Sequence, residues 1–212
     1  GDRAVRRVLA DAYALNPAGE RSGPDGNDQR APAYDSVAGG WTAPFVMAAI
    51  NARIVRRSNA LLDYEYGRDF RYDESVLCGG GLLGFATASA TATALGALLV
   101  GVGVAPTRVL LEKLFLPKPG DGPSANARER GFFDILLIGK SPDGELLRAK
   151  GYGDRDPGYG ATSRMLGEAA VCLATDNIAA GGGFWTPASS MGFDLIERLE
   201  SAAGMSFDIE PD

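Results

Sequence analysis

Residues 42–62 hold the side chains best suited to bind a polar or anionic ligand. On a helix of 3.6 residues per turn, two arginines lie on one flank of this stretch and two asparagines on the other: Arg56, Arg57, Asn51 and Asn59. Guanidinium and amide groups can orient a carboxylate or a carbonyl oxygen. A packed helix with a solvated basic flank would contain the same residues, and the sequence leaves both interpretations open.

A second candidate site lies at residues 154–163, Asp-Arg-Asp-Pro-Gly-Tyr-Gly-Ala-Thr-Ser, where a helix is predicted to begin. The backbone N–H groups of the helix start, together with the hydroxyls of Thr162 and Ser163, could hold an anionic or carbonyl group. The alternative is that Asp-Pro and the glycines only turn the chain and cap the helix.

One amphipathic helix over residues 42–62 is expected to position the first set of side chains. Thr42 or Ala43 is predicted at its N-cap and Pro44 in its first turn, where the missing N–H costs nothing. An apolar stripe at helical spacing is expected to pack on the core: Val46, Met47, Ile50, Ile54 and Leu61.

The composition limits the class of protein. The 212 residues carry a net charge of −6, which argues against a nucleic-acid partner because such proteins present basic surfaces. The chain contains no histidine, so it holds no Ser-His or Cys-His catalytic pair. Its acidic residues show no metal-loop spacing, and no metal site is expected.

The segment Leu82–Val104 has an unusual composition. It contains only Gly, Ala, Leu, Val, Phe and four small hydroxyl residues, and no charge occurs between Glu74 and Arg108. We predict a long, closely packed helix. Its length suits a membrane span, although Ala, Gly, Ser and Thr contribute little transfer energy. Three interpretations stay open: a core or interface helix, a surface that touches lipid or a long apolar substrate, and a true span.

The motif Gly79-Gly-Gly-Leu-Leu-Gly84 formally matches the dinucleotide fingerprint G-x-G-x-x-G. The preceding segment 68–78 alternates charged and apolar residues like a half-exposed strand, whereas a fingerprint strand is buried and parallel. No βαβ crossover follows. We therefore interpret the motif as a glycine-rich turn into a tightly packed helix.

The remaining pattern predicts an α+β fold, a mostly antiparallel mixed sheet covered by helices. The expected elements are a helix at 3–15, a solvated loop at 16–32, a strand at 68–78, a helix at 106–115, a short helix at 124–130, a hairpin at 132–140 and 145–152, helices at 158–176 and 186–199, and a strand at 205–209.

Three groups of residues resemble the C-terminal part of saccharopine dehydrogenase-like oxidoreductases, and among these the mycobacterial trans-acting enoyl reductases. They are residues 42–62, the tetrapeptide 130–133, and residues 156–162 together with 186–192. The likeness extends over about residues 3–209. It is specific at 42–62 and 156–162, and generic in the Ala/Gly-rich helix.

The resemblance implies that an N-terminal Rossmann domain of a longer parent protein binds NAD(P), and that no cofactor binds this chain alone. The chain would be the second half, a substrate-binding and dimerisation part that is inactive by itself. Residues 1–40 would form an entry helix and loop, and residues 41–185 the substrate and homodimer domain. Residues 186–212 would pack on the missing nucleotide-binding domain.

The resemblance further implies hydride transfer to a polarised C=C or C=N bond. Because this half has no histidine, a tyrosine, a lysine or a residue of the missing half would have to donate the hydrogen bond or proton, and Tyr159 is the candidate. Five residues are the expected substrate-binding set: Asn51, Arg56, Arg57, Asn59 and Thr162. The uncharged segment 82–104 suits an acyl or lipid-like substrate better than an amino acid.

Two non-enzymatic alternatives remain. One is a lipid- or membrane-associated interaction domain with residues 82–104 as its anchoring surface, and the other is a dimerisation module whose uncharged helix is the subunit interface. A cytoplasmic location, with or without membrane association, is the corresponding expectation.

Overall fold

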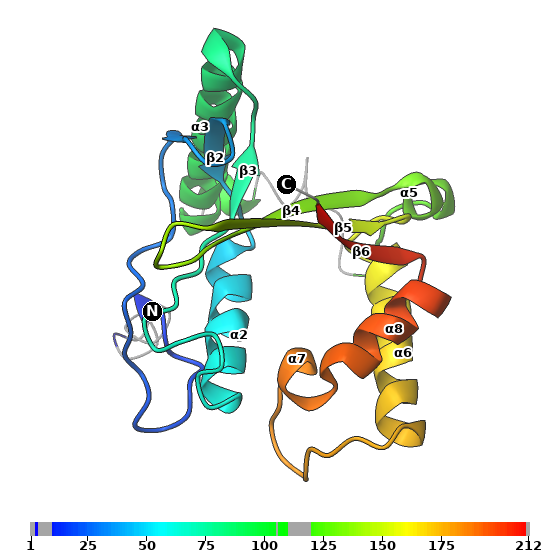
Figure 1. Ribbon diagram of the computed structural model, residues 1–212. Helices are drawn as coiled ribbons and strands as arrows, with labels where there is room; N and C mark the ends of the chain where they lie inside the picture. Colours follow the sequence, from blue (N-terminus) through cyan, green and yellow to red (C-terminus); the bar gives the residue numbers. More distant parts are fainter. Residues whose placement is uncertain (1–2, 4–9, 105, 110–119, 211–212) are drawn as a thin grey trace. The chain divides into compact units, whose positions relative to one another are not determined.

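A computed structural model describes residues 3, 10–104, 106–109 and 120–210 (Figure 1). The chain divides into two compact units, Gly1–Leu116 and Pro117–Asp212. The predicted α+β class with antiparallel pairing is confirmed, and the strands form two sheets of three strands each. The predicted domain limits after residues 40 and 185 stay predictions.

The first unit contains the sheet β1-β2-β3, with β1 at Ala33–Asp35, β2 at Gly40–Pro44 and β3 at Ser75–Leu77. Both pairings are antiparallel, with Tyr34 opposite Trp41 and Ala43 opposite Val76. Helix α2 covers Ala48–Leu61, and helix α3 covers Gly81–Gly103 and packs on β2. The fully buried apolar residues here are small, so the elements approach closely: Ala43, Ala52 and Ala88.

The glycines before α3 serve close packing. Gly79 adopts φ +86°, and its carbonyl oxygen accepts a hydrogen bond from the Trp41 N–H at 2.8 Å. A Cβ atom on Gly84 would lie 2.1 Å from this same carbonyl oxygen. The fingerprint-like motif therefore forms a tight turn against an antiparallel sheet, in agreement with the interpretation from the sequence.

The second unit combines the sheet β4-β5-β6 with helices. Its elements are α5 (Ala125–Arg130), β4 (Phe133–Lys140), β5 (Leu146–Gly153), α6 (Gly160–Thr175), α7 (Pro187–Ser190), α8 (Gly192–Ala202) and β6 (Met205–Glu210). The predicted hairpin is confirmed, since β4 and β5 pair from Phe133↔Gly153 to Lys140↔Leu146. The core of the second unit lies between α6, α8 and β6 and contains Ala161, Leu199, Ala203 and Met205.

Several predicted boundaries were wrong. Residues 42–44 belong to β2, and α2 begins only at Ala48 after Met47, whose side chain makes no capping hydrogen bond. Pairing with β3 outweighs the local helix signal, and Pro44 fits the end of the strand, where a missing N–H is tolerated. The strand predicted at 68–78 contracts to β3. The last helix is divided at Gly192, which has φ +50°.

Two other predictions fall partly outside the described residues. In the helix expected at 3–15, residues 3 and 10 are helical and residues 12–15 form turns, while residues 4–9 are not described. In the helix expected at 106–115, residues 106–109 are helical and the rest is not described.

The Gly84 contact gives a first prediction. Gly84→Ala should lower the free energy of unfolding by about 1–3 kcal/mol, because its Cβ cannot fit beside the Gly79 carbonyl without a backbone shift. The measurement is the urea midpoint of the purified chain. Gly96→Ala in the same helix is the control, since nothing lies within 4 Å of its Cβ position, and it should stabilise by up to about 1 kcal/mol. Equal midpoints for both variants would contradict this packing.

Candidate functional site

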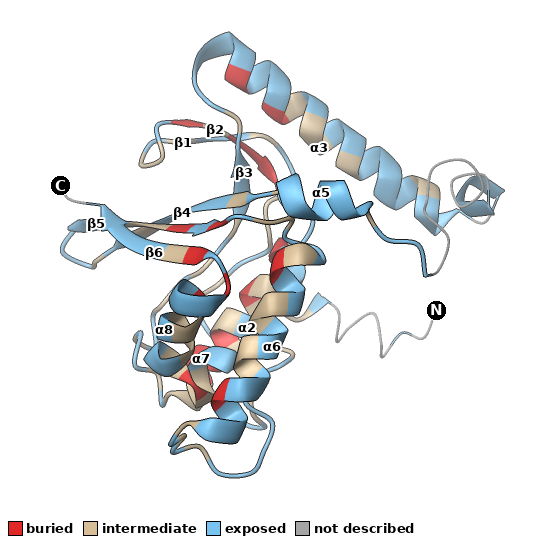
Figure 2. Cartoon of the chain, turned by 90° about the vertical axis from the view of Figure 1, so that its right-hand side faces the viewer, coloured by how far each residue is buried: buried red, intermediate tan, exposed pale blue. Residues whose placement is uncertain are grey.

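Helix α2 buries its polar side. Arg56, Ser58 and Asn59 are 4–5% exposed, and the other buried residues of the helix are alanines. Four of the five residues of the predicted apolar stripe are instead exposed, from 37% at Ile54 to 57% at Val46 and Ile50, and the fifth, Leu61, is half-buried. The expected orientation of this helix was therefore wrong, and Figure 2 shows blue and tan residues alternating with red along α2.

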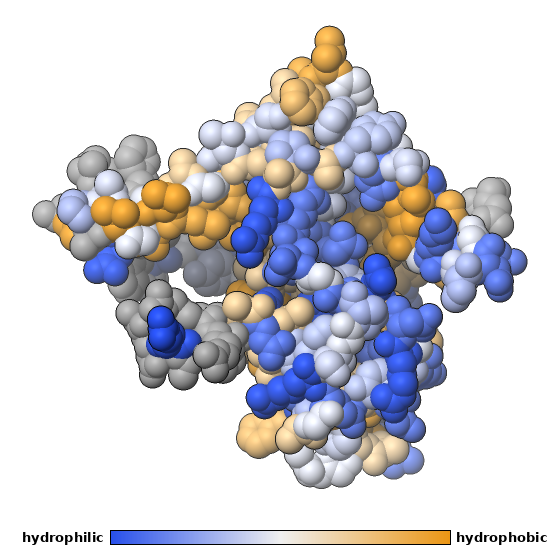
Figure 3. Space-filling view, turned by 90° about the vertical axis from the view of Figure 1, so that its left-hand side faces the viewer, coloured by the Kyte–Doolittle hydropathy of each residue, from blue (hydrophilic) through white to orange (hydrophobic). Residues whose placement is uncertain are grey.

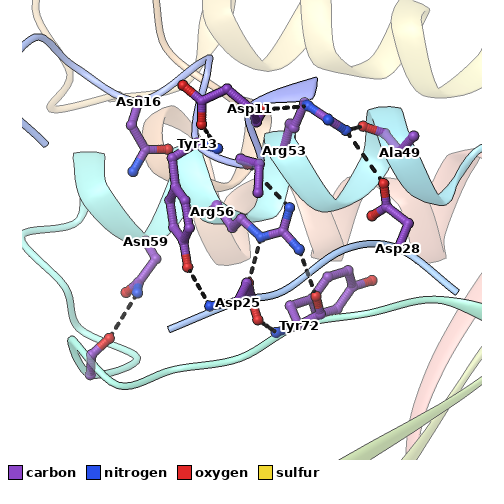
Figure 4. Close-up of polar contacts among 12 residues, drawn as sticks. Asp11, Tyr13, Asn16, Asp25, Asp28, Ala49, Arg53, Arg56, Asn59 and Tyr72 are labelled. Carbon is purple, nitrogen blue, oxygen red and sulfur yellow. Dashed lines mark hydrogen bonds and ion pairs between the residues drawn. The ribbon is translucent and has the colours of Figure 1, made fainter. Parts of the chain in front are cut away.

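The buried Arg56 explains the inversion (Figure 4). Its Nε donates to Asp25 Oδ2 at 2.5 Å, and the two side chains are 4% and 6% exposed. Its terminal nitrogens donate to the carbonyl oxygens of Ala12 and Tyr72 at 3.1 and 3.0 Å. The guanidinium also lies over the Tyr13 ring, 5.5 Å from its centroid. A buried guanidinium requires such partners, and the buried side of α2 faces them.

The Asp25 carboxylate connects three segments. Its other oxygen accepts from the Tyr72 N–H at 3.1 Å, and the Asp25 N–H donates to the Tyr13 hydroxyl at 3.0 Å. The loop at 16–32 was predicted to be solvated, yet it delivers this buried carboxylate and the buried Asn16 to α2. The loop has few apolar residues because ionic and hydrogen-bonded contacts hold it.

The other predicted substrate-binding residues of α2 also have partners within the unit. Asn59 donates to Gly67 O at 2.9 Å and accepts from the Tyr66 N–H at 3.0 Å, which closes the loop after the helix. Asn51 donates to Glu74 Oε2 at 2.9 Å, and Arg57 donates to Leu15 O.

Glu74 also affects a neighbouring tyrosine. Its other carboxylate oxygen accepts from the Tyr72 hydroxyl at 2.9 Å. Burial, followed by the negative charge of Glu74, raises the pKa of Tyr72. Tyr72 therefore stays a neutral hydrogen-bond donor at physiological pH.

A small cavity lies inside the polar cluster, lined by Tyr13, Asn16, Arg56 and Asn59 among others. Its volume is about 10 Å³, which is close to the space of one water molecule. The Oδ1 atom of Asn16, a residue 3% exposed, has no hydrogen-bond partner in the part of the chain that the structure describes. A bridging water fits this position, whereas a substrate does not.

At the start of α6, a carboxylate of the chain itself accepts hydrogen bonds from the backbone N–H groups that were expected to bind an anionic ligand. The Asp156 carboxylate accepts from the N–H groups of Gly158, Tyr159 and Gly160, at 2.6 Å from the last. The hydrogen bond from Gly160 is the main cause that lowers the pKa of Asp156. The hydroxyl of Thr162 donates to Pro157 O at 2.6 Å. These contacts match the alternative in which this stretch turns the chain and caps the helix.

The predicted site residues fall into two groups. Asn51, Arg56, Arg57 and Asn59 lie on α2 in the first unit, whereas Tyr159 and Thr162 lie at the start of α6 in the second. The Tyr159 side chain is 55% exposed, and its ring lies beside Gly122. The roles of these six residues in binding or catalysis stay predictions.

The sequence analysis missed Asp25, Tyr13, Asn16 and Tyr72. A signal for Asp25 existed, because a buried arginine needs an acid and loop 16–32 offers three, Glu20, Asp25 and Asp28. Nothing in the spacing distinguished Asp25 from Asp28, which makes only a 3.9 Å ion pair with Arg53.

Comparison with known proteins gives extensive similarity. Over 97% of this chain, 219 aligned positions are 42% identical to a protein of Mycobacterium tuberculosis. A Mycobacterium ulcerans protein is 38% identical over 77% of the chain, and a Mycobacterium bovis protein is 35% identical over 95%. These relatives are named trans-acting enoyl reductases. The chain is homologous to part of them, since the alignments cover 51%, 40% and 50% of their lengths.

The chain thus spans about half the length of the curated relatives it matches. No protein-family model matches the chain, and no solved structure gives a significant match. The wider likeness to saccharopine dehydrogenase-like enzymes stays a prediction.

The buried ion pair gives a second prediction. Asp25→Asn should lower the free energy of unfolding by about 3–5 kcal/mol, because it leaves the Arg56 charge buried without a counterion. Urea unfolding of the purified chain measures this. Asp134→Asn is the matched control, because the Asp134–Lys150 pair is 45% and 40% exposed and its loss should hardly move the midpoint. If both variants unfold at the midpoint of the unchanged chain, the buried pair does not hold the unit together.

Proposed function

We propose that the chain is the substrate-binding half of an NAD(P)-dependent enoyl reductase that acts on an acyl or lipid-like substrate. The observation that carries this proposal is the 42% identity, over 97% of the chain, to about half of a protein named as a trans-acting enoyl reductase. That the relatives are about twice as long supports a further domain in the parent protein, which we propose to be the nucleotide-binding domain.

The described residues do not fit a dinucleotide at the glycine motif. The strand β3 before it lies at the edge of an antiparallel sheet, whereas the fingerprint requires a parallel βαβ unit. The Gly79 carbonyl already accepts from Trp41 and fills the space that Gly84 leaves. We therefore assign NAD(P) binding to the other half of the parent protein.

The residues of this chain would contribute to the polarisation of the substrate. Reduction of a C=C bond conjugated to a carbonyl moves negative charge onto the carbonyl oxygen, and a donor fixed there stabilises the transition state. Tyr159 lies on an ordered turn at the start of α6 with its side chain 55% exposed, so its hydroxyl can reach a ligand. We assign it the role of donor to that oxygen.

The residues of α2 divide into two classes in this proposal. Arg56 and Asn59 are buried and already donate to groups of their own unit, so they would act as positioning residues that hold α2 rigid. Asn51 and Arg57 also donate within the unit but are only half-buried, and in this proposal they orient the substrate. The homodimer implied by the family resemblance is part of the same proposal.

The test is reductase activity of the full-length parent protein. NADPH and NADH oxidation should depend on addition of a 2-enoyl thioester and yield the saturated thioester, with a longer acyl chain preferred over a short one. The saturated thioester serves as the blank. If neither nucleotide is oxidised with any 2-enoyl thioester, the proposed function is wrong.

The Tyr159 assignment gives a third prediction. In the full-length protein, Tyr159→Phe should lower kcat about 100-fold with little change in KM, because the lost hydrogen bond forms mainly in the transition state. Steady-state kinetics measure this. Tyr152→Phe is the control, since it removes the hydroxyl of another partly exposed tyrosine of the same unit and should leave kcat unchanged. Unchanged turnover in the Tyr159 variant would remove this residue from the mechanism.

A further inference from the structure

Helix α3 is a long apolar helix that the protein hardly covers. Of its 23 residues only Gly84 and Ala88 are buried, both on the side that faces β2. In Figure 2 the rest of α3 is mostly pale blue, and Figure 3 shows hydrophobic, orange residues along its outer surface. Large aliphatic side chains are exposed at both ends, including Leu82 at 88%, Leu83 at 81% and Val100 at 68%.

By length and composition α3 could cross a membrane. It has a mean hydropathy of 1.6 over 18 residues, and 6% of that window is buried. A core helix of a soluble protein meets the same length and composition criteria but is mostly buried, whereas the residues of this chain leave α3 largely uncovered.

The last turns of α3 are apolar on every side. Successive helix residues point about 100° apart, so Leu98, Leu99, Val100 and Val102 cover about 200° of the helix surface, and the remaining side carries only alanine and glycine. They are 42%, 62%, 68% and 41% exposed. A single protein partner covers one side of a helix, whereas a helix that is apolar all round suits a surrounding apolar medium.

The charge pattern agrees with such a medium. The chain has 48 charged residues, 21 basic and 27 acidic, yet none lies between Glu74 and Arg108. The occupant of this surface must therefore be uncharged along the whole helix. The net charge of −6 further favours a zwitterionic surface over an anionic one.

Two backbone carbonyls at the end of α3 have hydrogen-bond partners within the chain. The Thr107 hydroxyl lies 2.6 Å from Gly101 O, one of the carbonyls that a helix end leaves free, and Val104 O accepts from the Arg108 N–H at 2.9 Å. Within the helix, the Thr87 hydroxyl donates to Leu83 O at 2.9 Å. Internal satisfaction of backbone groups is what hydrocarbon requires of a helix, and water does not require it.

We propose that α3 docks on a lipid surface and inserts its last turns into one leaflet. The first part of the helix is fixed on β2 by Gly84 and Ala88, which leaves the turns from Gly96 to Gly103 free to enter. These turns are about 12 Å long, far short of the roughly 30 Å hydrocarbon core, so they penetrate without crossing. This inference does not depend on the reductase activity.

The test is flotation of the full-length protein with phosphatidylcholine vesicles. The unchanged protein should float with the vesicles. The double variant Leu99→Asp, Val100→Asp should lower the vesicle-bound fraction at least about tenfold, because charged groups are strongly disfavoured in hydrocarbon. Leu166→Asp is the control, since Leu166 is 70% exposed on α6 and lies in the other unit. It should float like the unchanged protein.

Three results would overturn the proposal. In the first, the full-length protein does not bind vesicles while the 212-residue chain floats, which would mean that the other half covers α3. In the second, the double variant floats as well as the unchanged protein. In the third, the protein does not bind vesicles but forms a dimer, and light scattering shows that the double variant is monomeric, which would make α3 a contact between copies. Circular dichroism of the double variant checks that the fold is intact, as expected for two exposed positions.

Discussion

The buried ion pair between Arg56 and Asp25 determines how the first unit is assembled. The Arg56 guanidinium donates to the Asp25 carboxylate of the loop at 16–32. It also donates to the carbonyl oxygen of Ala12 and to that of Tyr72, in the segment before β3. The buried apolar residues described in this unit are alanines, and the loss of either member of the ion pair would leave an uncompensated charge among them. The pair specifies which side of α2 faces inward.

That orientation has a consequence for the outer surface. With the polar side of α2 buried, Val46, Met47, Ile50 and Ile54 face outward, and α3 adds a second uncharged surface. Monomeric soluble proteins rarely expose apolar surfaces of this extent. The two surfaces differ in kind. The α2 side belongs to a helix whose other side is polar, which suits a protein partner, whereas the last turns of α3 are apolar all round.

The sequence predicts the parts of this fold in which local pattern and burial agree. The uncharged helix α3, the hairpin of β4 and β5 and the short helix α5 follow from composition, alternation and turn residues. The start and the inner side of α2 could not be read in the same way. Thr42 and Ala43 join a strand through partners more than thirty residues away, and Arg56 is buried because of an acid in a distant loop.

The candidate site shows the same limit. The sequence placed Tyr159 and Thr162 correctly at a helix start, but it could not show that Asp156 occupies the N–H groups expected for a ligand. It also could not distinguish an arginine that binds substrate from one whose guanidinium is buried in contacts within the protein, since both require the same residue type at the same spacing. The difference depends on long-range contacts of loop 16–32.

The most direct test of the half-enzyme account is a calorimetric titration of NADPH into the 212-residue chain and into the full-length parent protein. The account predicts binding to the parent alone, because the described glycine motif of this chain is filled by its own backbone. Tight binding of NADPH to the isolated chain would contradict the account, and the dinucleotide-binding site would then have to be assigned to Gly79–Gly84.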